Sequence, residues 1–180
     1  MSAAVVKCGA TEQQTACSSA TAIGVWVFTT AFALTIVGLI VIAPFAQAHG
    51  HPEFASTIYQ VFSFVCHQIP ERSFHLGGYQ YAVCSRCTGL YSGFAVAALV
   101  YPLARSLKSA DTPPRLWLIL AAVPLAIDFG LGYFSIWQNT HLTRFATGSL
   151  LGAVAVFYVA PGLIDLSSTI IRPLKRLMSR

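Results

Sequence analysis

Apolar residues form four long runs along the chain, separated by short polar stretches. The first run, residues 23–45, contains no charged residue and would measure about 34 Å as a helix. The other runs give helices over about residues 84–104, 116–134 and 142–162. Runs of this length and apolar content are typical of helices that cross a lipid bilayer. The pattern therefore predicts an all-α fold, an integral membrane bundle with four transmembrane helices.

Two shorter segments each have one apolar face. Residues 51–66 have Pro52 near their start and are too short to span, which predicts a half-helix that lies at the membrane surface or dips into it. Residues 164–180 repeat apolar positions opposite basic ones. This pattern predicts an interfacial helix that rests on anionic lipid and is kinked at Pro173.

The pattern divides the chain into three regions: a polar tail at 1–22, a membrane domain at 23–163 with a Cys/His loop at 46–83, and a basic amphipathic tail at 164–180. Ala46-Gln47-Ala48 has the small-x-small pattern of a signal-peptide cleavage site. The apolar run before it is too long for the core of a signal peptide. We therefore expect residues 23–45 to remain as a membrane span.

Composition and charge agree with this class of protein. The chain is 56% hydrophobic and 9% charged, so it cannot cover a water-facing surface as a soluble domain does. Its net charge is +5, and the basic residues gather in the 105–115 loop and in residues 172–180. No basic stripe is interleaved with aromatics, which argues against nucleic acid as a partner. The positive-inside rule places both termini in the cytoplasm and the 46–83 loop outside.

Three cysteines and one histidine lie within about two dozen residues. Cys66-His67 is followed by Cys84-x-x-Cys87. A C-x-x-C pair lets two thiolates bind one ion, and the Cys-His pair can supply the other two tetrahedral positions. This set predicts a zinc site at the outer face, although iron and copper also accept sulfur and imidazole ligands. A disulfide between Cys84 and Cys87, with Cys66 as a buried apolar residue, is the other interpretation.

Charged residues inside the later spans predict a second polar feature. Asp128 lies within residues 116–134, where an unpaired carboxylate costs roughly 3 kcal/mol. It should therefore face the bundle, with Arg144 as its expected partner and Arg86 in the same polar seam. Such a seam is either a structural ion pair that fixes helix register or a substrate or proton site.

Two GxxxG steps, Gly89 to Gly93 and Gly148 to Gly152, predict close packing of the helices that carry them, on each other or on another chain. If the helix continued back through Cys84, that residue and Cys87 would lie on the face opposite Arg86. The metal face and the arginine face are therefore expected to be separate sites.

The chain resembles a family of bacterial and archaeal membrane proteins called domain of unknown function 2085. The resemblance covers about residues 55–160 and rests on Cys66-His67-Gln68, Pro70, Arg72-Ser73-Phe74, Cys84, Arg86-Cys87, Gly89, Tyr91, Gly93, Asp128, Arg144, Thr147-Gly148 and Gly152. It implies a multi-span protein of a bacterial inner or archaeal plasma membrane, and it implies no activity. The family pattern often has asparagine where His141 stands, so this imidazole can approach the outer site.

A binding or assembly role is the favoured function, as a small subunit of a membrane complex or as a homo-oligomer. The reason is that 180 residues leave little room for a catalytic lobe. Two other classes stay open: an enzyme, either a thiol oxidoreductase or one acting on lipid headgroups, and a transporter that uses Asp128. Gln68, Glu71 and Arg72 place a donor, an acid and a base in the same loop, without a reaction that demands them.

Overall fold

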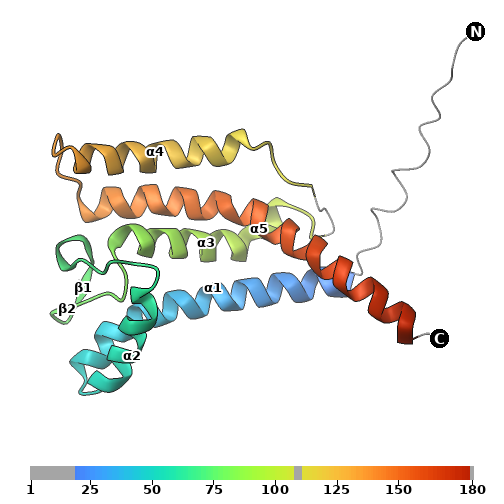
Figure 1. The fold of residues 1–180 in the computed structure, drawn as a ribbon, viewed down its shortest axis with the longest axis horizontal. Coiled ribbons are helices and arrows are strands. Elements are labelled where there is room, and N and C mark those ends of the chain that lie inside the picture. The colour runs from blue at the N-terminus through green and yellow to red at the C-terminus, as the bar shows by residue number, and fades with distance from the viewer. Residues whose placement is uncertain (1–18, 108–110, 179–180) are drawn as a thin grey trace, which may run out of the picture.

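The computed structural model describes residues 19–107 and 111–178, with side chains described as far as residue 167. Most of the polar tail 1–22, and the side chains that would face anionic lipid in the basic tail, lie outside this part of the chain. The lipid contact of the tail therefore stays a prediction. The described residues form a bundle of long helices that lie side by side, with a small lobe at one end (Figure 1).

Among the described residues, four helices are long and apolar enough to cross a membrane, which confirms the all-α membrane fold. Their bounds are α1 Ser19–Ala48, α3 Ser85–Ala104, α4 Leu116–Tyr133 and α5 His141–Met178. The expected spans agree with these bounds within one residue for α3 and α4. α1 is longer than its expected span at both ends, and α5 continues beyond residue 162. Bilayer-facing side chains explain the many exposed apolar residues, because lipid replaces water around the bundle.

The fourth span and the tail form one continuous helix rather than two. α5 runs from His141 to Met178 and passes through Pro173. A proline removes one backbone donor and bends a helix, but it does not have to end it. Figure 1 shows the last part of α5 turning away from the axis of the bundle.

Glycines bring α3 and α5 into direct backbone contact at the centre of the bundle. A side chain at Gly89 would collide with the carbonyl oxygen of Phe145, and one at Gly148 with that of Arg86. The prediction that the two GxxxG helices pack closely is confirmed, and they pack on each other within one chain. α4 lies along the outer side of α5, and α1 lies along α3 (Figure 1).

The lobe at the end of the bundle contains α2, Pro52–Ser63, a short 3-10 helix, Pro70–Arg72, and a two-stranded hairpin. β1, His75–Leu76, pairs antiparallel with β2, Tyr79–Gln80. The sequence interpretation missed this hairpin. Gly77 and Gly78 both have positive φ, 60° and 86°, and two such glycines between strands are a strong hairpin signal.

A small apolar core fixes the lobe to the bundle. Ile40 and Ala43 of α1 pack with Ile58 and Phe62 of α2, and the buried Cys66 belongs to the same cluster. Ala82 and Val83, fully buried just before α3, complete it. Cys66 belongs to this core and Cys84 packs against it. The core therefore holds both residues close to the start of α3.

Candidate metal centre

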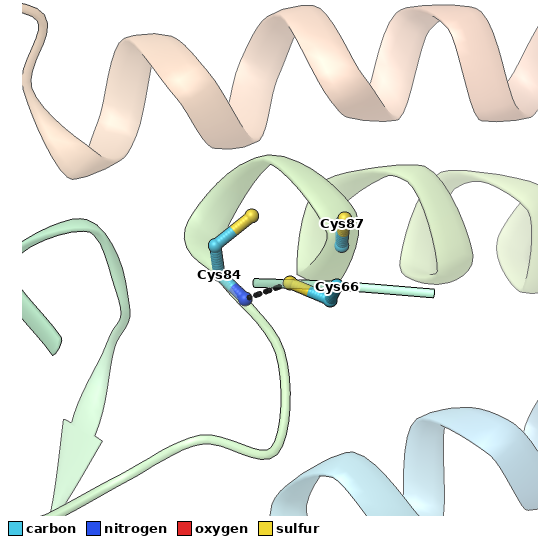
Figure 2. Close-up of side chains that lie close together, drawn as sticks. All are labelled: Cys66, Cys84 and Cys87. Atoms are coloured by element: carbon cyan, nitrogen blue, oxygen red, sulfur yellow. Dashed lines mark hydrogen bonds between the residues drawn. The ribbon is translucent and has the colours of Figure 1, made fainter. Parts of the chain in front are cut away.

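The sulfur atoms of Cys66, Cys84 and Cys87 converge at the start of α3 (Figure 2). Cys66 follows α2, Cys84 is the residue that caps α3, and Cys87 lies in the first turn of that helix. All three sulfurs are free thiols and lie within 4.8 Å of one another. The expectation that distant stretches bring these three cysteines together is confirmed.

The spacing of the three sulfurs suits one tetrahedral ion. Zinc binds thiolates at about 2.3 Å, which separates two sulfur ligands by roughly 3.8 Å. Sulfurs that all lie within 4.8 Å of one another need only small side-chain movements to reach that separation. The residues present therefore fit a zinc ion, and soft sulfur donors also accommodate copper(I) or iron.

Backbone N–H groups point at the buried sulfur of Cys66. The N–H of Cys84 donates to it at 3.2 Å, as the dashed line in Figure 2 shows, and the N–H of Gln68 does so at 3.5 Å. Gln68 has a φ of +50°, in the left-handed region that residues other than glycine rarely adopt. Such bonds stabilise a thiolate, the form that binds metal.

The thiolate form is also favoured at Cys84. Hydrogen bonds from Cys66 and Cys87 hold the pKa of the Cys84 thiol well below its usual range, and the backbone N–H groups of Cys87 and Arg86 act in the same direction. Burial opposes this shift. Arg86 acts on this pKa through its backbone N–H at the helix start.

Gln68 ties the loop together through its side-chain amide. Its Nε2 donates to the carbonyl oxygens of Tyr59 on α2 and of Ala82 before α3, both at 2.7 Å. The two segments that supply Cys66 and Cys84 are therefore joined at a second point. Gln68, noted in the sequence as a donor in the loop, thus holds together the segments that carry the thiols.

The predicted fourth ligand, His67, is not part of the cluster of ligand atoms. Its side chain is exposed and lines a cavity beside the thiols, but its ring nitrogens lie outside the group of atoms within 4.8 Å of one another. Three of the four predicted ligands are thus brought together, and the fourth lies next to them.

This cavity has a volume of about 360 Å³ and joins the thiols to three arginines. It is lined by Cys66, Cys84, Cys87, His67, Gln68, Arg72, Arg86, Arg144, Phe129 and two aliphatic residues. The prediction of separate metal and arginine faces is wrong. The helix does not continue back through Cys84 but begins at Ser85, with Cys84 as its cap. Cys84, Arg86 and Cys87 therefore all lie around the end of α3, where one cavity can reach them.

Asp128 forms an ion pair with Arg86, not with Arg144 as expected. Asp128 is 9% exposed. The side-chain amide of Asn139 donates a hydrogen bond to the backbone carbonyl of Asp128. The Arg86 guanidinium lies 5.6 Å from the centre of the Phe129 ring. Arg86 reaches Asp128 because both residues lie near helix ends at one end of the bundle. Phe129 and Asn139 were missed, since neither carries a sequence pattern that separates it from its neighbours.

The remaining candidates do not line the cavity. Nδ1 of His141 lies 3.0 Å from the hydroxyl oxygen of the fully buried Ser85, and its ring packs 5.7 Å from that of Phe74. This contact joins the start of α5 to the start of α3. Glu71 is exposed on the short 3-10 helix.

Comparisons with known proteins agree with this architecture. A family model described as predicted membrane protein, domain of unknown function 2085, matches residues 66–158. The chain belongs to this family. The matched region begins at the first thiol of the cluster and includes Asp128 and Arg144.

Two archaeal proteins are similar to the chain. An uncharacterized protein of Methanocaldococcus jannaschii is 38% identical over 104 residues, which cover 58% of the chain and 67% of that protein. An uncharacterized protein of Methanothermobacter thermautotrophicus is 34% identical over 87 residues, which cover 48% of the chain and 77% of that protein. No solved structure matches the chain.

Proposed function

We propose that this membrane protein binds one zinc ion through the thiolates of Cys66, Cys84 and Cys87. The convergence of three free sulfurs within 4.8 Å, from two distant stretches, is the observation that carries the proposal. His67 is the proposed fourth ligand, because it follows Cys66 and lines the same cavity. Three sulfurs and one imidazole make a closed structural zinc set.

The bound ion would fasten the lobe to the bundle. Zinc supplies strong bonds to thiolates and has no redox chemistry of its own. In the protein, the N–H groups of Cys84 and Gln68 hold the Cys66 sulfur, and the amide of Gln68 joins the two ligand segments. A fixed lobe at the extracytoplasmic face suits a small binding or assembly subunit of a membrane complex.

Elemental analysis of protein purified without chelators tests this function. We expect about one zinc atom per chain, and loss of that zinc in Cys66→Ser, Cys84→Ser and Cys87→Ser variants. Cys17→Ser is the matched control, because Cys17 lies in the polar tail. Less than one metal atom for every few chains, with zinc unchanged in the three variants, would refute the proposal.

A second candidate is a membrane thiol oxidoreductase. The lowered pKa of Cys84 and the C-x-x-C spacing at a helix start favour it, because these features activate cysteines. Oxidation of Cys84 and Cys87 to a disulfide would pass two electrons and two protons to a quinone acceptor. A thiol count separates the candidates: reversible loss of two thiols on quinone addition supports the oxidoreductase, and thiols that stay reduced and metal-bound exclude it.

A further inference from the structure

Three arginines from three elements line the cavity beside the thiols. Arg72 ends the short 3-10 helix, Arg86 lies in the first turn of α3 and Arg144 in the first turn of α5. Arg86 pairs with Asp128, whereas Arg72 and Arg144 form no ion pair with any residue that the structure describes. The Nε atoms of Arg86 and Arg144 are buried and have no hydrogen-bond partner among the same residues.

This arrangement leaves uncompensated positive charge. Three guanidinium groups face one carboxylate, and Arg144 lies close enough to Arg72 and Arg86 for their charges to repel one another. A zinc ion with three thiolates would carry one negative charge, so even the metal-bound site would keep a positive surplus. Arg72 is exposed and Arg144 is partly buried, so an anion that enters the cavity can reach both side chains. Planar guanidinium groups match the oxygens of phosphate.

An apolar groove adjoins this cavity at Val65. It has a volume of about 620 Å³ and is lined by side chains of α1, α2, α3 and α5, including Phe32, Phe94 and Val159. Val65 lines both the groove and the arginine cavity, and Leu90 of the groove lies one helical turn beyond Arg86. The charged cavity lies where the spans begin, and the groove is lined by residues further along the spans. A bilayer around these spans would place the cavity at the depth of its headgroups and the groove among its acyl chains.

We propose that the arginine cavity binds the phosphate of an anionic phospholipid, with an acyl chain of that lipid in the adjoining groove. Charge complementarity selects the headgroup, and the apolar lining next to it selects a lipid over a soluble phosphate. This inference does not depend on the zinc site, because the arginines lie on elements held by helix packing and by the Arg86–Asp128 ion pair.

Native mass spectrometry of the purified full chain in detergent tests the inference. The probes are dioctanoyl phosphatidylglycerol, dioctanoyl phosphatidylcholine and inorganic phosphate, each titrated separately. We expect phosphatidylglycerol to bind about tenfold or more tightly than either other probe. Arg72→Gln and Arg144→Gln should each weaken it about tenfold, while Arg115→Gln, at the opposite end of the bundle, should not change it.

A variant that fills the groove tests the acyl-chain contact separately. Ala155→Phe should weaken phosphatidylglycerol binding about tenfold, and Ala126→Phe on the exposed face of α4 is its control. Thermal unfolding and zinc content measured on every variant separate loss of the lipid site from loss of fold or metal. Equal binding of phosphatidylcholine, equal binding of inorganic phosphate, or no effect of the arginine and Ala155 variants would overturn the proposal.

Discussion

Gln68 links the two chain segments that carry the clustered thiols. Its backbone N–H points at the Cys66 sulfur, and its amide bridges the carbonyl oxygens of Tyr59 and Ala82. The side chain is half-buried, so water cannot fully replace these bonds. The position of Cys66 relative to Cys84 therefore depends on Gln68.

Gln68→Ala should lower the free energy of unfolding by about 1–3 kcal/mol, because it leaves two carbonyl groups without their donors. We also expect weaker zinc binding, since loss of such supporting contacts costs about tenfold to a hundredfold in metal affinity. Thermal unfolding and competition with a zinc chelator measure the two effects. Gln60→Ala on the exposed face of α2 should change neither, and equal behaviour of the two variants would contradict this role.

The Arg86–Asp128 ion pair gives a second prediction for single residues. Asp128→Asn should destabilise the fold by about 1–3 kcal/mol, because it leaves the partly buried guanidinium without its carboxylate. The double variant Arg86→Met/Asp128→Leu should recover part of this loss in thermal unfolding. If Asp128→Asn is as stable as the wild type, the pair has no structural role, and a substrate or proton site becomes the better interpretation.

At the scale of elements, the contact between α3 and α5 positions both the thiols and the arginines. Gly148 of α5 faces the carbonyl oxygen of Arg86, which lies in the turn that also contains Cys87. The close approach of the two helices therefore sets where the cavity lies. A change in their separation should move the start of α3 and disturb the site.

Gly148→Ala should destabilise the protein by about 1–3 kcal/mol and weaken zinc binding, because the added methyl group overlaps the Arg86 backbone. Gly38→Ala is the matched control, since an added methyl group there meets no atom within 4 Å. Thermal unfolding in detergent and zinc content compare the two variants. A Gly148→Ala protein with wild-type stability would contradict the close packing.

The elements differ in how far the sequence predicts them. Long apolar runs and GxxxG steps predict the four spans and the α3–α5 contact, because the bilayer requires continuous apolar helices and close approach requires small residues. The hairpin was not predicted, and the predicted partner of Asp128, Arg144, was wrong. The hairpin depends on the conformation of its turn, and the ion pair depends on which side chains meet at the helix ends. Hydrophobic periodicity predicts neither property.

At the scale of the whole molecule, five chain segments meet at one end of the bundle. The thiols, the cavity and the ion pair take their residues from the segment after α2, the short 3-10 helix, the start of α3, the last turns of α4 and the start of α5. These helices end side by side in Figure 1. The cysteine spacing in the sequence predicts the convergence of the sulfurs. It does not predict the joining of thiols and arginines, which requires the helices to be placed relative to one another.

The charge distribution predicts the orientation of this end. The basic loop near residue 105 and the basic C-terminal tail should lie in the cytoplasm, which leaves the thiol site outside. A green fluorescent protein fused to the C-terminus should therefore fluoresce, and an alkaline phosphatase fused there should be inactive. The reverse pair of results would place the thiol site in the cytoplasm.

X-ray absorption spectroscopy at the zinc edge of the purified protein tests the metal centre most directly. The proposed site predicts three sulfur ligands at about 2.3 Å and one nitrogen ligand at about 2.0–2.1 Å. The His67→Ala variant should lose the nitrogen contribution and keep the three sulfurs. A zinc shell without sulfur, or a protein without zinc in which Cys84 and Cys87 are joined by a disulfide, would contradict the account.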